Sequence, residues 1–303
     1  MFVENNTHFD PMCRSYEFDD GSSIVTTAVF ARLQTSERAL TPLPTEARSA
    51  LAEAPAATQT SYRFRGSVHP QQRGATAQDL KLILGDRRVV SLRLFGERRF
   101  RADGTFSAPL PLGTTELSAA NAFGGTYERL AGEIDGLPHP RLRVTCPQNP
   151  EGKGYVPPGF SPLDQPLPNI EFAEDLIRHA GQLTAPAILA LSGSCLGAAV
   201  RDGNTDALHS SVLHGALPEL MSARRTGPTT VEVHGASPAP LSWKVPGSPV
   251  RVSVCRHVRY HPVPFHIRDV MVDLDSGEAT ILYAHVARLE PGAPASDVLI
   301  ESA

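Results

Sequence analysis

Apolar and polar side chains alternate with a two-residue period in many parts of this chain. In the segment 62–68 (YRFRGSV), Tyr62, Phe64 and Val68 fall on one face and the arginines fall on the other. The segment 23–33 (SIVTTAVFARL) is rich in β-branched residues, which also favour a strand. These patterns predict a fold made mainly of short strands.

Turn signals separate several of the alternating runs. Gly85-Asp86 and Gly96-Glu97 divide the segments 80–84, 89–95 and 98–106, which predicts a three-stranded antiparallel meander. The last third of the chain predicts strands at 229–234, 241–245, 250–260, 265–274 and 279–287. Asp275-Ser276-Gly277 lies between the last two and predicts a closing hairpin, because aspartate and glycine tolerate turn geometry.

Helical patterns are short and few. The sequence predicts one short helix at 46–53 and another at 171–180. The small, apolar segment 185–200 is predicted to be buried core, because it is too short to cross a membrane. Between 132 and 168, prolines and glycines predict a long loop, and such loops inside compact domains are usually functional or binding surfaces.

Composition supports a β-rich globular protein. The chain has 303 residues, 41% of them hydrophobic, with 27 prolines and 24 glycines, so it can bury a sizeable core between turns. We expect a mainly β (β-rich α+β) fold, in which antiparallel sheets pack as a sandwich-like body with long loops and few short helices. One domain over 1–303 is expected, with sub-lobes 1–180 and 181–303 as a possible division.

Charge and cysteine content exclude several classes of protein. The net charge is -4 and the arginines are scattered among acids, so the sequence has no basic face for nucleic acid. No apolar run has membrane-spanning length, and the polar amino terminus does not resemble a signal peptide, which predicts a cytoplasmic protein. The four cysteines lie far apart without a C-x-x-C pair, which indicates reduced and mostly buried thiols.

One segment imitates the nucleophile elbow of a hydrolase. In Gly193-Ser194-Cys195-Leu196-Gly197, Cys195 takes the third position of the elbow pattern. A thiol nucleophile needs a base, for which His209 and His214 are the nearest candidates. The alternative, a small buried cysteine in a Gly/Ser-rich turn, is the favoured interpretation.

The densest set of potential zinc ligands contains Cys255, His257, His261 and His266. Their spacing does not fit the common zinc patterns, and Pro262 and Pro264 interrupt the strand between the last two histidines. Histidines at a strand end are therefore favoured over a structural metal, and no metal or other cofactor is predicted.

Three carboxylates follow one another near the predicted closing hairpin. Asp269, Asp273 and Asp275 have a spacing that allows a shared strand face, which would suit a glycosidase or a calcium site. A calcium loop needs more oxygen donors around its glycine than this segment offers. The favoured interpretation is a solvated face of the hairpin.

Five phrases occur in an order that resembles the family named domain of unknown function 2169. They are 66–70 (GSVHP), 92–100 (LRLFGERRF), 121–125 (NAFGG), 149–155 (NPEGKGY) and 167–171 (LPNIE). The segment 270–288 also resembles the closing hairpin of that family. Glu97 and Phe100 stand where the family usually has aspartate and tryptophan, and the tryptophan-rich middle section of typical members is shortened, which leaves Trp243 as the only tryptophan.

The resemblance implies a non-enzymatic adaptor or co-chaperone of type VI secretion. Such a protein binds an effector toxin and helps to load it onto a spike-tip (PAAR-type) or spike-trimer protein, possibly beside a second chaperone. No catalytic residues come with the resemblance. From the composition, neither a membrane nor a nucleic acid is expected as a partner. The rival functions are a thiol-dependent hydrolase or transferase using Cys195, and a carbohydrate-binding sandwich, for which 6% aromatic residues are few.

We expect the partner to bind the segment 121–171, because a proline-rich loop presents apolar side chains at a small entropic cost. The alternative is that the aromatic residues only pin the loop to a sheet, and that the glycines only shape turns. The candidate partner-binding residues are Asn121, Phe123, Gly124, Gly125, Asn149, Tyr155, Phe160, Asn169 and Ile170.

Overall fold

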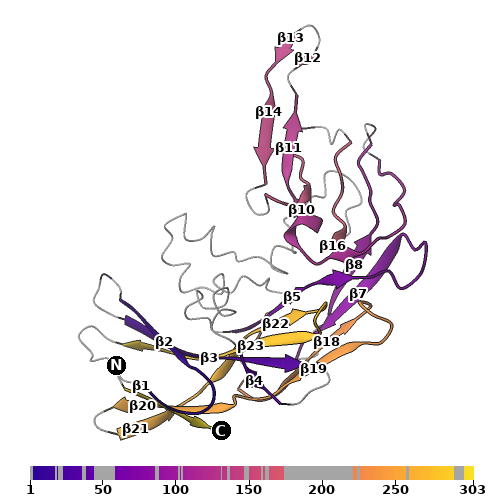
Figure 1. Cartoon of the computed structure of the whole chain (residues 1–303). Helices are drawn as coiled ribbons and strands as arrows, with labels where there is room; N and C mark the ends of the chain where they lie inside the picture. Colours follow the sequence, from indigo (N-terminus) through magenta and orange to yellow (C-terminus); the bar gives the residue numbers. More distant parts are fainter. Residues whose placement is uncertain are drawn as a thin grey trace.

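The computed structural model describes most of the chain as β-strands and connecting turns (Figure 1). It describes residues 3–303 except 18, 20–22, 36–38, 44–58, 86–88, 102, 104, 131, 135–136, 147–149, 158–159, 161–163, 174–220, 224–225, 257–258 and 290–296. Among the described residues, the only helical element is the short 3-10 helix η2 (Ala119–Asn121). The expected β-rich fold is therefore confirmed.

Two large sheets form the body. The seven-stranded sheet contains, in order, β17 (Met221–Ala223), β5 (Gln59–Arg65), β22 (His266–Asp273), β23 (Glu278–Leu289), β3 (Ser23–Gln34) and β2 (Met12–Glu17), with β4 (Thr41–Pro42) also paired to β3. The five-stranded sheet contains β16 (Ile170–Phe172), β8 (Val89–Phe95), β7 (Ala77–Ile83), β18 (Thr229–His234) and β19 (Leu241–Val245). Most neighbours are antiparallel, but β5 and β22 are parallel.

The smaller sheets complete the molecule. A four-stranded sheet has the order β1 (Val3–Asn6), β24 (Val298–Ser302), β20 (Val250–Arg256) and β21 (Arg259–Val263). The two-stranded pairs are β6 (Ser67–Val68) with β9 (Thr115–Glu116), β10 (Phe123–Gly124) with β15 (Lys153–Gly154), β11 (Thr126–Arg129) with β14 (Leu142–Thr145), and β12 (Gly132–Ile134) with β13 (Leu137–His139).

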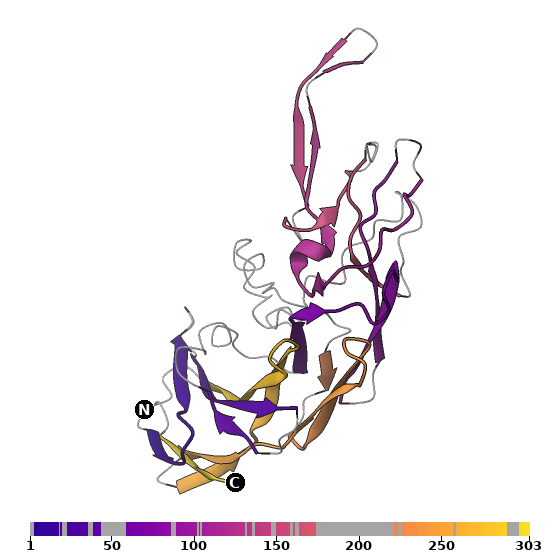
Figure 2. The ribbon, with the colours of Figure 1, turned by 45° about the vertical axis from the view of Figure 1, so that its right-hand side comes forward.

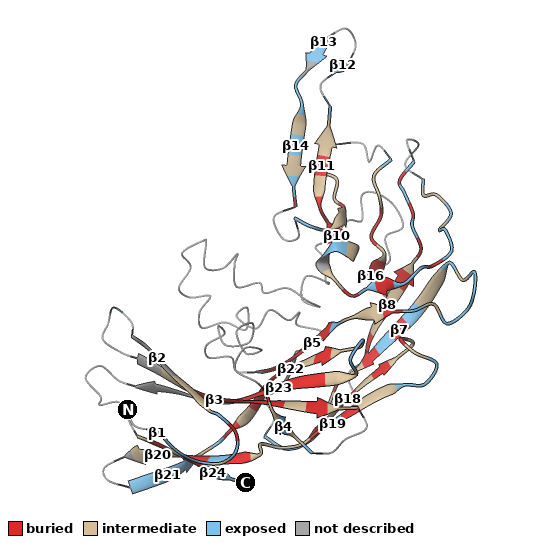
Figure 3. Ribbon diagram, viewed as in Figure 1, coloured by how far each residue is buried: buried red, intermediate tan, exposed pale blue. Residues whose placement is uncertain are grey.

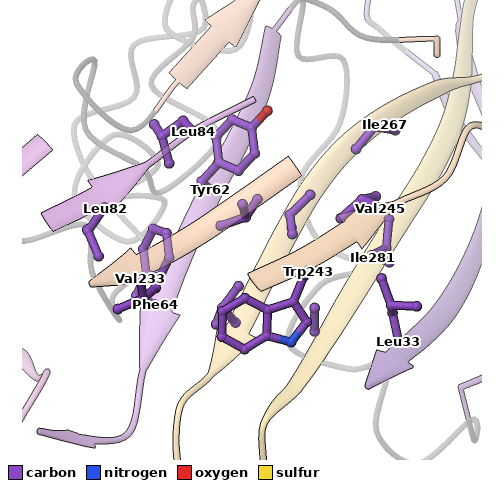
Figure 4. Close-up of a cluster of buried hydrophobic side chains, with 14 of the residues drawn as sticks. Leu33, Tyr62, Phe64, Leu82, Leu84, Val233, Trp243, Val245, Ile267 and Ile281 are labelled. Atoms are coloured by element: carbon purple, nitrogen blue, oxygen red, sulfur yellow. The ribbon is translucent and has the colours of Figure 1, made fainter. Parts of the chain in front are cut away.

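One hydrophobic core joins the three larger sheets. Figure 4 shows Tyr62 and Phe64 from β5 near Leu82 of β7, Val233 of β18 and Trp243 of β19. All five residues are 0% exposed, as the alternation in 62–68 predicts for Tyr62 and Phe64. The indole Nε1 of Trp243 donates a hydrogen bond to the carbonyl of Gly277 at 3.1 Å, so this buried polar atom is satisfied.

A two-stranded ribbon projects from the body, and we call residues 126–145 the arm (Figures 1 and 2). Its lower part is the pair β11 and β14, and its tip is the pair β12 and β13. Buried residues concentrate in the strands of the body, whereas the arm is mostly intermediate or exposed (Figure 3). The prediction of a loop from 132 onward was wrong here, because these residues pair locally as a hairpin.

Most strand predictions in the body are confirmed. Strands β18 and β19 coincide with the predicted segments 229–234 and 241–245, and β22 and β23 pair across the predicted turn as a closing hairpin. Segment 250–260 was predicted as one strand, but it forms β20 and the start of β21, which pair antiparallel.

Two other predictions were wrong. The third meander strand, 98–106, makes only isolated bridges, because the outer edge of β8 already pairs with β16. The predicted helix 171–180 begins instead as strand β16, and residues 174–180 lie outside the described residues. The predicted helix 46–53 and the predicted core segment 185–200 also lie outside them.

Candidate functional site

The phrases that carry the family resemblance meet at the base of the arm. The backbone NH of Phe95 donates to the carbonyl of Asn169 at 2.8 Å, and the NH of Asn169 donates to the carbonyl of Asn121 at 2.9 Å. The NH of Lys153 donates to the carbonyl of Ala122 at 2.8 Å. Backbone hydrogen bonds therefore join four segments that are far apart in sequence. We call this hydrogen-bonded junction the backbone knot.

The fifth phrase reaches this knot through strand β9. Strand β6, which follows Gly66, pairs with β9, and the NH of Leu117 donates to the carbonyl of Gly66 at 2.9 Å. The side-chain amide of Asn121 then donates to the carbonyl of Glu116 at 2.9 Å. Asn121 is thus a structural link, and sequence reasoning alone had assigned it to partner contact.

Glycines allow the close backbone approach in the knot. Gly125 has φ +89°, and a Cβ added there would lie 2.1 Å from the carbonyl oxygen of Gly152. Gly154 has φ +88°, with Pro168 as its nearest neighbour. Residues that have a Cβ atom are strained at positive φ, so both turns depend on glycine. The turn-shaping interpretation of the glycines accounts for these contacts.

Lys153 lies at the centre of a polar cluster. Its Nζ donates to Asn121 Oδ1 at 3.1 Å and to Asn169 Oδ1 at 2.8 Å. Asn169 Nδ2 in turn donates to the carbonyl of Phe95 at 3.0 Å. The two asparagines orient the ammonium group, which is half-buried and retains a third N–H.

A buried ion pair lies under this cluster. Arg98 donates to Glu171 and, at 2.9 Å, to the carbonyl of Pro168. The Arg98 and Glu171 side chains are only 7% and 4% exposed. The guanidinium also lies over the Phe95 ring, 3.6 Å from its centroid. Burial lowers the pKa of the Arg98 guanidinium, and the neighbouring Glu171 carboxylate opposes this shift.

A pocket with a volume of about 190 Å³ opens beside the cluster. Its polar lining comes from charged groups and one amide, whereas proline and leucine provide the apolar walls. The lining residues are Glu97, Arg98, Arg99, Lys153, Pro166, Leu167 and Asn169. Sequence reasoning had missed Arg98 and Lys153 as site residues, although both stand inside the quoted phrases.

The predicted aromatic contacts divide into buried and accessible residues. Phe123 is 8% exposed and packs edge-on against Tyr155, with ring centroids 6.3 Å apart. Phe160 is 38% exposed and lies 5.6 Å from the ring of Tyr127, the buried residue at the foot of the arm. Phe160 and the half-buried Tyr155 can reach a partner from this face.

Several candidates hold the scaffold together through buried contacts or internal hydrogen bonds. Ile170 is 0% exposed and belongs to the main core, so it does not offer a contact to a partner. The backbones of Gly124 and Gly125 are buried, and Asn169 is engaged with Lys153 and Phe95. Asn149 lies outside the described residues.

The positions that depart from the family pattern stay close to the site. Phe100, where the family usually has tryptophan, is 0% exposed and packs edge-on against Phe106 at 5.2 Å between ring centroids. An aromatic side chain therefore still fills this buried position. Glu97 is exposed and lines the pocket.

Two of the three carboxylates near the closing hairpin pair with a neighbouring strand, so they do not form the predicted solvated face. Asp269 is 7% exposed and accepts hydrogen bonds from Ser61 and Arg63 on β5. Asp273 pairs with Arg65 at 2.9 Å. The prediction was wrong for Asp269 and Asp273 because β22 has a second, parallel neighbour in β5, which supplies their partners. Asp275, in the turn, is exposed as predicted.

The other chemical candidates are only partly covered by the structure. Cys195, His209, His214 and His257 lie outside the described residues. Within the part of the chain that the structure describes, no three His, Cys, Asp or Glu side chains form a metal-binding group. Among the described cysteines, Cys13 and Cys255 are free thiols, and Cys146 is buried. No helix among the described residues has the length and apolar character of a membrane span.

Comparison with known proteins gives one family. The family model described as an uncharacterized protein conserved in bacteria (DUF2169) matches residues 15–198, which is more than half of the chain. No curated protein and no solved structure matches the chain. The matched range contains all five phrases and the backbone knot at the base of the arm.

Proposed function

The chain belongs to the bacterial family DUF2169, and from this premise we propose that it is a non-enzymatic adaptor of type VI secretion. It binds an effector protein and helps to load it onto a PAAR-type or spike-trimer protein, with a second chaperone as a further possible partner. We expect it to do so in the cytoplasm. The type of system follows from the resemblance to that family, and the mode of binding is argued from the arm.

The observation that carries the proposal is the projecting arm. In the described part of the chain, no third strand pairs with β11, β12, β13 or β14, so the arm has two open edges. An isolated two-stranded hairpin is marginal in water, and an open strand edge is a template for pairing with another chain. A partner that pairs with or covers the arm would stabilise it.

Apolar side chains are available where such a partner would lie. Leu130 follows β11 and is 73% exposed, and Phe160 is 38% exposed at the foot of the arm. Phenylalanine is enriched at protein interfaces, and the exposed Leu130 would add apolar area to the contact. The base of the arm is tied to the knot, because Cys146 NH donates to the Gly125 carbonyl at 2.9 Å. We propose this face as the effector-binding surface.

The test is co-purification from the native host, in which the tagged chain is assayed for the effector and spike proteins encoded beside its gene. The double variant Leu130→Asp/Phe160→Ala should lower capture at least about tenfold, as expected for loss of interface anchors. Val89→Asp is the control for the introduced charge, because Val89 is 51% exposed and lies at the start of β8, outside the arm.

Both variants need a thermal unfolding measurement, since only a folded variant reports on binding. Full capture by the folded double variant would place the interface elsewhere. Failure of the wild-type chain to capture any effector or spike protein would contradict the proposed adaptor function itself.

A further inference from the structure

The pocket at the base of the arm combines cationic and apolar walls. Lys153 and Arg99 contribute positive groups, and Pro166 and Leu167 contribute apolar surface. Its volume of about 190 Å³ suits one side chain better than a large ligand, because pockets that bind drug-sized ligands measure roughly 300–1,000 Å³. The pocket therefore fits a small group that is apolar along its stem and charged at its end.

Lys153 is a cation without a carboxylate partner. Its hydrogen-bond acceptors are two neutral amide oxygens, and among the described residues no carboxylate oxygen lies within 4 Å of its Nζ. Two oriented acceptors fix the direction of the ammonium group, so its remaining N–H needs little rearrangement to meet an anion.

The other charges on the pocket wall leave this cation uncompensated. Arg98 is occupied by the buried carboxylate of Glu171, although its Nε has no hydrogen-bond partner among the described residues. Arg99 is 57% exposed and lies 3.5 Å from Asp164, which is 74% exposed, so this pair is weakened by solvent. Glu97 is exposed and adds one opposing negative charge to the lining.

We propose that the pocket receives the side-chain carboxylate of a glutamate or aspartate of the bound protein. Lys153 and Arg99 contact the carboxylate, and Pro166 and Leu167 pack against its methylene stem. This inference rests on the proposed function for the identity of the protein that supplies the carboxylate. The chemistry of the pocket does not depend on the proposed function. The pocket would then fix the register of a partner that lies along the arm.

The direct test uses propionate, which reproduces the stem and carboxylate of a glutamate side chain, against the ¹⁵N-labelled full chain at constant ionic strength. Propionate should cause saturable chemical-shift changes at the amides of Lys153 and Asn169. The neutral isostere propionamide should cause none, because it lacks the charge. Inorganic phosphate should bind more weakly, because it has no apolar stem.

Two variants and one control assign the binding to the pocket. Lys153→Met should abolish the saturable shifts, whereas Lys244→Met, which removes an exposed lysine of β19, should leave them unchanged. Glu97→Gln should tighten propionate binding about twofold to fivefold, as expected for removing one exposed repulsive charge. This second variant keeps the test valid if Lys153→Met does not fold.

Several outcomes would overturn the proposal. They are the absence of propionate shifts, equal shifts with propionamide, phosphate binding as tight as propionate binding, or weaker propionate binding in Glu97→Gln. If propionate binds saturably but the folded Lys153→Met variant captures the effector undiminished, then the carboxylate that fills the pocket does not come from the bound protein. If propionate binds but the wild-type chain captures no effector, the adaptor function fails and the carboxylate pocket stands.

Discussion

At the residue scale, Gly125 combines a positive φ with a close backbone contact inside the knot. Its φ of +89° is strained for other residues, and an added Cβ would lie 2.1 Å from the Gly152 carbonyl oxygen. We expect Gly125→Ala to lower the free energy of unfolding by more than about 1 kcal/mol, since alanine is incompatible with the native backbone there. Urea denaturation measures the change.

Gly113→Ala is the control for this substitution. Nothing lies within 4 Å of a Cβ added at Gly113, so alanine should change stability little at that position. Equal stability of the two variants would show that the close approach of Gly125 to Gly152 does not constrain the fold.

The buried pair of Arg98 and Glu171 gives a second expectation. Glu171→Gln removes one charge and leaves the guanidinium uncompensated beside the Phe95 ring. Breaking a buried pair in this way costs about 3–5 kcal/mol. The exposed pair of Glu128 and Arg141, joined at 2.6 Å, provides the matched Glu128→Gln control, which should cost less than about 1 kcal/mol. Chemical denaturation that gives similar losses for both variants would contradict this ranking.

Sequence patterns predicted the roles of residues correctly where those roles depend on local backbone geometry. The glycines of the family phrases were assigned to tight turns, and the positive φ values at Gly125 and Gly154 agree. The pairing of Arg98 with Glu171 was missed, because alternation along one strand does not identify its neighbour. Asp269 was misread for the same reason, since its partners Ser61 and Arg63 come from a strand about two hundred residues earlier.

At the element scale, stability should differ between the body and the arm. Strands β3 and β23 pair over twelve residues, and most of their described side chains are buried. Strands β12 and β13 pair over three residues, and no other strand pairs with them in the described part of the chain. Local opening is easiest where buried contacts are fewest.

Hydrogen exchange should therefore be slowest for the amides of 28–33 and 279–284, and fastest for those of 132–134, Leu137 and His139. Mass spectrometry after peptic digestion resolves these segments in the free protein. Adding a partner should slow exchange in the arm without changing the central strands. Equally slow exchange in the arm and in β23 of the dilute, free chain would mean that the arm is already covered.

Local turn chemistry explains which elements the sequence predicted. The closing hairpin was predicted because Asp275, Ser276 and Gly277 lie directly between two alternating runs, and β22 and β23 pair across them. The edge of β8 was mispredicted because its neighbour β16 lies about eighty residues later along the chain. A pattern that repeats every two residues does not specify which distant strand pairs with a given strand edge.

At the scale of the whole molecule, both large sheets combine early and late parts of the chain. Strand β22 lies beside β5, and β23 lies beside β3. In the other sheet, β18 lies beside β7. The family match ends at residue 198, so strands from outside the matched range complete the sheets that carry the site.

This interleaving bears on the possible sub-lobes 1–180 and 181–303. A fragment ending at 180 would lack β18, β22 and β23, and would expose the core faces of β3, β5 and β7 to water. The folded state is stabilised by removing such apolar area from water, and the fragment would leave this area exposed. We therefore expect neither fragment to fold alone, and we expect their mixture, refolded together from urea, to regain the β-type circular dichroism and dispersed NMR spectrum of the intact chain. The intact chain refolded in the same way is the control, and a dispersed spectrum from fragment 1–180 alone would establish the sub-lobe as an independent unit.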